Sequence, residues 1–165
     1  MSGSIVTNPT PIGSAMAILA GLVATSITIG FSAPAAVSGL VGLILLFGGL
    51  LLPRPGVITS GAALLALGVL LAGLAGAPGA AVGIGFVGVV VAWDVAHNSL
   101  SHGRQVGRDA PTVVPEAVHA GASLVVGLLA TGFGYGVFVL VGAGQPATAV
   151  ALLTLGAVIL ILAVK

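Results

Sequence analysis

Cysteine is absent from the 165 residues of this chain. Its absence excludes disulfide bonds, thiolate metal sites and cysteine nucleophiles. Charge is nearly as scarce, because the chain has only four basic and three acidic residues, or 4% of its length. Soluble domains carry about 25% charged residues, which solvate their surface. The chain therefore cannot cover itself with polar groups, and we expect a lipid bilayer to form part of its solvent.

The small net charge limits the partners that the chain can bind. The formal charge is +1, and no cluster of lysine and arginine forms a basic patch, so binding of nucleic acid is not expected. The first eleven residues contain no lysine or arginine. Because a secretory signal opens with a basic stretch, we expect the first apolar segment to be a retained span. No sequence feature indicates a cofactor.

Hydrophobic residues make up 58% of the chain and fall into six long runs separated by proline and glycine. A transmembrane helix needs roughly 20 apolar residues, and proline disfavours helix at the residue before it. The runs lack the alternation of lumen-facing β-strands. They predict an all-α polytopic membrane bundle, a single domain over residues 1–165 with six helices in three hairpins. We place the helices at residues 12–31, 35–52, 56–76, 79–96, 117–142 and 147–164.

The basic residues predict the orientation of these spans. Arg54 lies in the second connection, Arg104 and Arg108 lie in the fourth, and Lys165 is the last residue. With six spans, all these places fall on one side of the membrane, and the connections on the other side carry no charge. Basic residues near span ends favour the cytoplasmic side. We therefore expect a cell-membrane protein with both termini and the loop 97–116 in the cytoplasm.

Glycine is abundant, with 27 residues, which is more than turns require. Within the spans it joins other small residues in stripes, such as Ser38 with Gly42 and Gly132 with Gly136. Helices in lipid associate by close backbone approach, which small residues permit. The stripes predict tight helix packing, and they make association of the chain with itself an expectation of unspecified stoichiometry.

Polar chemistry is concentrated between Trp93 and His119, where all three carboxylates and all three histidines lie. Asp94 and His97 are three residues apart, as are Glu116 and His119, and side chains at this spacing share a helix face. Each pair is therefore predicted to point toward a common spot. The candidate polar cluster consists of Asp94, His97, His102, Arg104, Gln105, Arg108, Glu116 and His119.

This cluster admits three interpretations. In the first, Asp94, His97, Glu116 and His119 hold one metal ion, as carboxylate and histidine side chains do in helical bundles. In the second, Arg104 and Arg108 pair with Asp94 and Glu116, or with lipid phosphates, and lower the cost of charge at the membrane edge. In the third, Asp94 takes part in ion or proton transport, because ionisable groups in spans mark translocation routes.

One stretch of the sequence combines Trp93-Asp94, the segment from Gly103 to Asp109, and the segment Glu116-Ala-Val-His119-Ala-Gly-Ala-Ser. This stretch, about 30 residues long, resembles a family of uncharacterised haloarchaeal membrane proteins. Family members carry an acidic residue where this sequence has Arg104. The resemblance implies a small multi-spanning protein with its functional face at this loop. The matched polar residues are Asp94, Gln105, Arg108, Glu116 and His119.

These observations lead to three hypotheses of function. The leading one is a non-enzymatic structural or accessory membrane protein whose loop 97–116 docks a membrane or cytoplasmic protein. The alternative is a small transporter or channel with ion or proton coupling near Asp94. The third is an intramembrane metal-binding protein. None of the three requires a catalytic residue, and the sequence indicates none.

Overall fold

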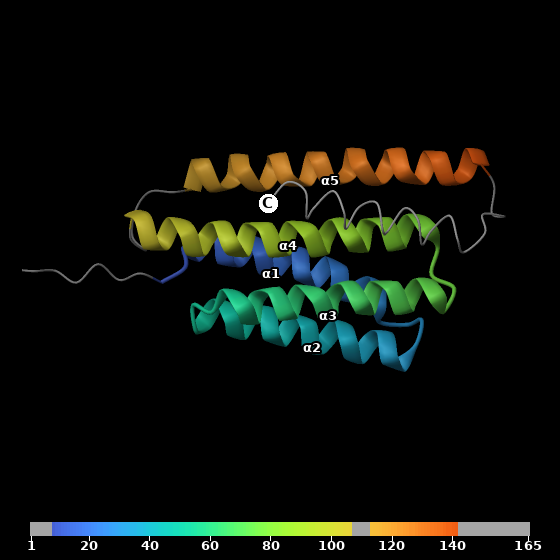
Figure 1. Ribbon diagram of the computed structural model, residues 1–165, viewed down its shortest axis with the longest axis horizontal. Coiled ribbons are helices and arrows are strands. Elements are labelled where there is room, and N and C mark those ends of the chain that lie inside the picture. The colour runs from blue at the N-terminus through green and yellow to red at the C-terminus, as the bar shows by residue number, and fades with distance from the viewer. Residues whose placement is uncertain (1–7, 107–112, 142–165) are drawn as a thin grey trace, which may run out of the picture. The chain divides into compact units, whose positions relative to one another are not determined.

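The computed structural model describes residues 8–106 and 113–141, which form five α-helices and no strand (Figure 1). The helices are α1 (Pro11–Thr28), α2 (Ala33–Leu51), α3 (Pro55–Leu74), α4 (Gly79–Val106) and α5 (Val113–Val141). All five are long and apolar enough to cross a membrane. They confirm an all-helical fold and indicate a multi-pass membrane protein. Residues 8–106 and 113–141 thus contain five helices, and the sixth predicted span, 147–164, lies outside them.

Proline and serine start the first three helices where the sequence predicts breaks. Pro11 and Pro55 are the first residues of α1 and α3, a position at which the fixed φ of proline suits a helix and its missing N–H costs nothing. Ser32 precedes α2, and its Oγ accepts a hydrogen bond of 3.3 Å from the Ala35 N–H. Such a cap satisfies one of the free donors at a helix start.

The fourth helix is longer than predicted, because it continues ten residues past the expected end at residue 96. The sequence becomes polar at His97, but a buried face continues through Ala96, Leu100 and Gly103. Apolar or small residues at this spacing stay on one side of a helix, and here that side packs on α1. The helix therefore ends where this buried face ends rather than where polarity begins.

The predicted loop 97–116 is helical over most of its length. Residues 97–106 belong to α4, and residues 113–116 form the first turn of α5. Most of the expected cytoplasmic loop is thus helix. Arg108 and the rest of residues 107–112 lie outside the described residues.

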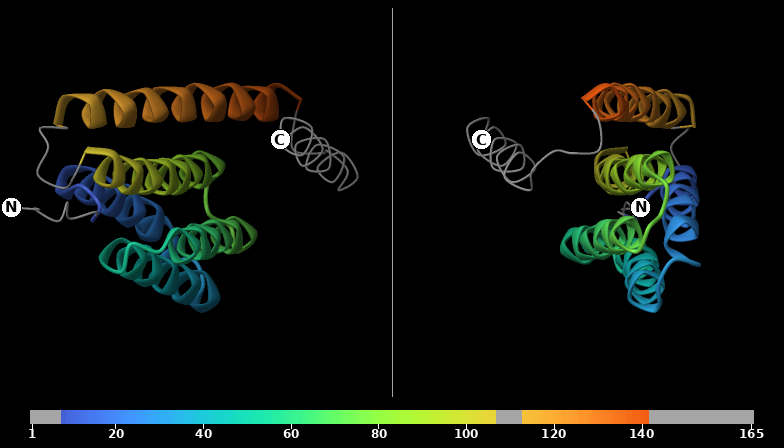
Figure 2. Two further views of the ribbon diagram at one scale, coloured as in Figure 1. Left: turned by 60° about the vertical axis from the view of Figure 1, so that its left-hand side comes forward. Right: turned by 90° about the vertical axis from the view of Figure 1, so that its right-hand side faces the viewer.

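The helices pack most closely in the pairs α2–α3 and α1–α4, which lie side by side in both figures (Figures 1 and 2). The α2 and α3 backbones approach closely at Gly42 and Gly61: a Cβ at Gly42 would lie 2.6 Å from the Leu65 backbone N. In the second pair, a Cβ at Gly88 would lie 2.9 Å from the Ala20 carbonyl O. The predicted hairpins α1–α2 and α3–α4 also touch, but they are not the principal packing pairs.

Small residues act as predicted in α2. Ser38 lies on the α3 side of α2, and its Oγ donates a hydrogen bond of 2.8 Å to the Leu64 carbonyl O. Close approach therefore explains the small residues of α2. The packing role predicted for Gly132 and Gly136 of α5 stays a prediction.

The chain divides into two units, residues 1–132 and 133–165. The first unit contains α1 to α4 and the part of α5 up to Gly132. Within it, α5 runs antiparallel to α4: Gly127 lies against Val87, and His119 lies against Asp94. The described part of the second unit is the last stretch of α5, up to Val141.

The turn that carries Arg54 and the end of α4 that carries Arg104 lie at the same end of the α1–α4 bundle (Figure 1). The Trp93 indole Nε1 donates a hydrogen bond of 3.3 Å to the Thr59 Oγ1, which places the start of α3 beside the second half of α4. This arrangement agrees with basic residues on one face. The prediction that this face is cytoplasmic stays a prediction.

Candidate functional site

Six polar residues face one another between α4 and α5. The helical spacing of i, i+4 and i+8 on α4, and of i, i+3 and i+7 on α5, places three on one face of each helix. We call this set the polar seam. It consists of Asp94, Asn98 and His102 on α4 and of Glu116, His119 and Ser123 on α5.

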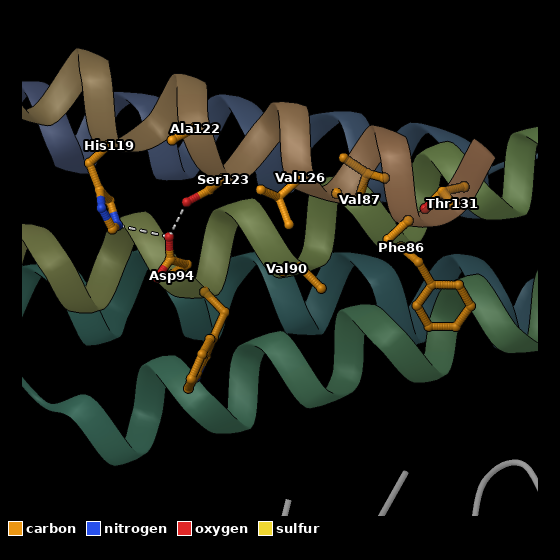
Figure 3. Close-up of a pocket in the computed structure, with 12 residues that line it drawn as sticks. Phe86, Val87, Val90, Asp94, His119, Ala122, Ser123, Val126 and Thr131 are labelled. Atoms are coloured by element: carbon orange, nitrogen blue, oxygen red, sulfur yellow. Dashed lines mark hydrogen bonds and ion pairs between the residues drawn. The ribbon is translucent and has the colours of Figure 1, made fainter. Parts of the chain in front are cut away.

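At the inner end of the polar seam, two α5 side chains point at Asp94 (Figure 3). The Ser123 Oγ donates a hydrogen bond of 2.5 Å to the Asp94 Oδ2. The His119 Nε2 lies 2.8 Å from the same oxygen, but it has no hydrogen-bond partner of good geometry. The contact between Asp94 and His119 is therefore an ion pair when the imidazole is protonated, rather than a well-aligned hydrogen bond.

At the outer end of the polar seam, Glu116 is buried where α1, α4 and α5 meet, with 1% of its surface exposed. A Cβ at Gly13 of α1 would lie 3.0 Å from the Glu116 Oε2 and 2.6 Å from the Ser99 Cβ of α4. The His102 Nδ1 lies 3.8 Å from the Glu116 Oε1. We call Glu116 with Thr10, Gly13, Ser99 and His102 the Glu116 pocket.

The start of α1 shows how deep these residues lie in the span. The Thr10 N–H donates a hydrogen bond of 3.3 Å to the Ser99 carbonyl O. The start of α1 and Ser99 of α4 therefore lie at the same height along the bundle. Because α1 has 18 residues, it needs nearly all of them to cross about 30 Å of hydrocarbon. Ser99 then lies near one edge of the span. Asp94, five residues earlier in α4, lies roughly 7 Å further in at 1.5 Å per residue.

Beyond Asp94, α4 and the part of α5 up to Thr131 line an open apolar groove of about 550 Å³ (Figure 3). Asp94, His119 and Ser123 lie at one end of this groove, and Thr131 lies at the other. The walls are mostly hydrophobic and include Phe86, Val87, Val90, Trp93, Ala122, Val126, Gly127 and Ala130.

His97 lies outside the polar seam, on a side of α4 that faces α3. Its Nδ1 is 2.9 Å from the Trp93 carbonyl O, and its Nε2 is 3.5 Å from the Thr59 Oγ1. The rings of Trp93 and His97 have centroids 4.9 Å apart. These contacts turn His97 away from Asp94, with which the sequence paired it.

Arg104 pairs with no carboxylate in the described residues, and its predicted contact with lipid phosphates stays a prediction. Arg104 is exposed, and both ion pairs within residues 8–106 and 113–141 join a carboxylate to a histidine. The Gln105 Nε2 donates a hydrogen bond of 3.0 Å to the Ser101 Oγ, also on α4. Arg108 lies outside the described residues.

The four residues proposed for a metal site are brought together only in part. Asp94 meets His119, whereas His97 faces α3 and Glu116 lies in its own pocket. In the part of the chain that the structure describes, no three His, Asp or Glu side chains converge as metal ligands would. The arrangement suits the transfer of protons between carboxylate and imidazole better than the coordination of a metal ion.

Sequence reasoning overlooked four polar residues at this site. Asn98 and Ser123 complete the faces of the polar seam, and their spacing from Asp94 and Glu116 could have identified them. Thr10 and Ser99 line the Glu116 pocket. Thr10 is more than a hundred residues from Glu116 in sequence, so only the packing of α1 against α4 could reveal it.

Comparison with known proteins identifies the family of the chain. No curated protein and no solved structure gives a significant match. Residues 7–161 match a family of unknown function, DUF7519. The match covers nearly the whole chain, including α1 to α5, whereas the resemblance in the sequence rests on about 30 residues. The chain is therefore a member of the DUF7519 family of unknown function, and its apolar helices are compatible with a membrane protein.

Proposed function

We propose that this protein conducts protons across the membrane as a small channel or transporter, with Asp94 and His119 as the pair that accepts and releases them. The observation that supports it most is the position of Asp94. Its carboxylate lies within a helix that is long and apolar enough to span a membrane, 2.8 Å from the Nε2 of an imidazole on another helix. Ionisable groups in spans are costly and mark ion or proton routes.

The chemistry of the pair suits this role. Carboxylate and imidazole side chains form the proton relays of membrane pumps and transporters. The Ser123 Oγ, which donates to Asp94, holds the carboxylate toward α5. The polar seam leads from Asp94 toward the edge of the span, and the groove continues from Asp94 in the opposite direction. Protons would cross by way of this pair.

Docking of a partner through residues 97–116 stays a prediction. Its basis was a long polar loop, and most of that segment is helix. The greater length of α4 supports the proton hypothesis, because Asp94 lies within the helix rather than at its end. We include in the proposal that the end of the bundle bearing Arg54 and Arg104 faces the cytoplasm, since basic residues favour that side.

Proton flux into reconstituted liposomes tests the proposal. Purified protein is placed in vesicles that contain a pH-sensitive dye, and a pH gradient is imposed with valinomycin and potassium to prevent charge build-up. Wild-type vesicles are expected to acidify faster than protein-free vesicles. The isosteric variant Asp94→Asn should reduce the rate to that of protein-free vesicles, because an amide cannot carry the proton.

His97→Gln and His119→Gln form the matched comparison. Each variant removes one imidazole near Asp94. His97 is three residues away on the same helix, and its Nδ1 contacts the Trp93 carbonyl O, whereas His119 contacts the Asp94 carboxylate. His119→Gln should slow the flux, and His97→Gln should leave it at the wild-type rate. Wild-type flux no faster than that of empty vesicles, or unchanged flux in Asp94→Asn, would refute the proposal.

A further inference from the structure

The groove between α4 and α5 has the size and the lining of a small-molecule site. Its volume is about 550 Å³, and such sites measure roughly 300–1,000 Å³, often between the helices of a bundle. They are mostly hydrophobic, with a few polar groups that orient the ligand. Here Asp94, His119 and Ser123 gather at one end, and apart from Thr131 the remaining lining is apolar (Figure 3). The groove therefore suits a molecule with one polar end and an apolar body.

The polar end of the groove carries a carboxylate that a ligand can reach. The side chain of Asp94 is 33% exposed. Both of its contacts with α5 fall on one oxygen, because the Ser123 Oγ donates to Oδ2 and the His119 Nε2 lies 2.8 Å from Oδ2. The other oxygen, Oδ1, is not taken up by α5. Neither lysine nor arginine is among the described residues that line the groove. A positive group in a ligand would complement this carboxylate.

Aromatic side chains also favour a cation over an anion. Trp93 lines the groove next to Asp94, and Phe86 lines it further along α4. The face of an aromatic ring carries negative charge density and attracts cations, and tryptophan does so most strongly. The Trp93 indole is held in place, because its Nε1 donates a hydrogen bond of 3.3 Å to the Thr59 Oγ1 and its ring packs on that of His97. A ring that is already positioned loses little entropy when a ligand binds.

The apolar walls favour an organic cation over a metal ion. Ions such as Mg²⁺ and Ca²⁺ take about six or more oxygen ligands, whereas side-chain oxygens line the groove only at Asp94, Ser123 and Thr131. No three His, Asp or Glu side chains converge in the described ranges 8–106 and 113–141. An organic cation gains instead by burying its apolar body against the walls.

We propose that the groove binds a hydrophobic organic cation, with the positive centre at Asp94 and the apolar body along Phe86, Val90 and Val126. Exchange of this cation for protons would make it the transported substrate, a role that rests on the proposed function. The binding itself does not depend on that function.

Two ions of the same shape and opposite charge test the inference on the full-length protein. Tetraphenylphosphonium and tetraphenylborate each carry four phenyl rings around one central atom. Equilibrium dialysis in detergent, with protein-free micelles as the blank, measures how much of each ion the protein binds. Tetraphenylphosphonium should bind saturably and change the fluorescence of Trp93, the one tryptophan of the chain. Tetraphenylborate should not bind above the blank.

Three variants locate the bound cation. Asp94→Asn should lower the affinity for tetraphenylphosphonium about tenfold or more, because an amide removes the charge attraction. Val126→Phe should also lower it, since a phenyl ring there fills part of the groove. Val125→Phe is the matched control, because this neighbouring valine is also exposed but is not among the residues that line the groove. Its affinity should stay at the wild-type value.

Several results would overturn the cation site. Absence of saturable binding, or equal binding of the two ions, would leave an apolar surface with no preference for positive charge. Unchanged affinity in Asp94→Asn, or equal effects of Val125→Phe and Val126→Phe, would place the cation elsewhere. If Asp94→Asn fails to fold, the comparison of the two ions and the two valine variants still decides the question.

The cation site and the proposed function can fail separately. Saturable binding that depends on Asp94, without proton flux in vesicles, would refute the proposed function and leave the cation site intact. Proton flux that depends on Asp94, without binding of tetraphenylphosphonium, would support the proposed function and overturn the cation site.

Discussion

Asp94 and His119 pair across two helices, with Oδ2 and Nε2 2.8 Å apart, although each has a titratable neighbour three residues away on its own helix. His97 turns instead toward Trp93 and Thr59, and Glu116 lies in the pocket beneath α1. Sequence spacing places side chains on a common face, but contact between helices decides which groups meet. The two acid–imidazole pairs among the described residues therefore form between helices rather than within them.

The coupling between Asp94 and His119 can be measured by a double-mutant cycle. Asp94→Asn, His119→Gln and the double variant are unfolded in mixed micelles, and the free energies of unfolding are compared. Polar contacts between helices in membrane proteins couple by about 0.6 kcal/mol on average, so we expect a coupling of about 0.5–1 kcal/mol. The same cycle with His97→Gln should give additive effects. Additivity in the Asp94–His119 cycle would contradict the ion pair.

Close packing of α2 on α3 predicts opposite effects for two glycines of α2. A Cβ at Gly42 would lie 2.6 Å from the Leu65 backbone N and 2.8 Å from the Gly61 carbonyl O, neither of which can rotate away. Gly42→Ala should therefore destabilise the protein by about 1–3 kcal/mol, as overpacking does.

Gly48 on the same helix is the matched control, because a Cβ there meets no atom of residues 8–106 or 113–141 within 4 Å. Gly48→Ala should stabilise the protein slightly, by about 0.5–1 kcal/mol, since alanine loses less backbone entropy than glycine in a helix. Thermal unfolding in detergent measures both variants. Equal effects of the two substitutions would show that α2 and α3 do not pack as described.

The depth of Asp94 can be measured through its neighbour Trp93, the one tryptophan of the chain. Trp93 is six residues from Ser99 and should lie roughly 9 Å inside the edge of the span. Its fluorescence should be quenched by lipids brominated on their acyl chains more than by iodide in water. A variant with Trp93→Phe and Gln105→Trp, at the end of α4, should show the reverse preference. Strong quenching of Trp93 by iodide would place Asp94 outside the hydrocarbon.

The absence of cysteine allows orientation to be mapped without background labelling. Single cysteines at Arg54 and Arg104 should react with an impermeant maleimide from the cytoplasmic side. Cysteines at Phe31 and Ala75, in or next to the turns after α1 and α3, should react from the opposite side. Labelling of Arg54→Cys and Arg104→Cys from different sides would refute the shared basic face.

The positions of the first five helices could be predicted from the sequence, because long apolar runs and proline are local signals. Pro11 and Pro55 begin helices as expected, and Ser32 caps a third. Hydropathy alone could not predict the end of α4, since one side of its last ten residues is polar and the other side packs against the bundle. Only the buried positions Leu100 and Gly103 show that the helix continues against α1.

The sequence by itself determined that lipid must solvate this chain, because its few charges cannot cover a surface, and it placed every acid and histidine in one window. The tertiary structure decided how those groups pair and which of them water can reach. Glu116 is buried because α1 closes over it with a glycine at the point of contact. Such a contact depends on residues more than a hundred positions apart, which no local pattern of the sequence encodes.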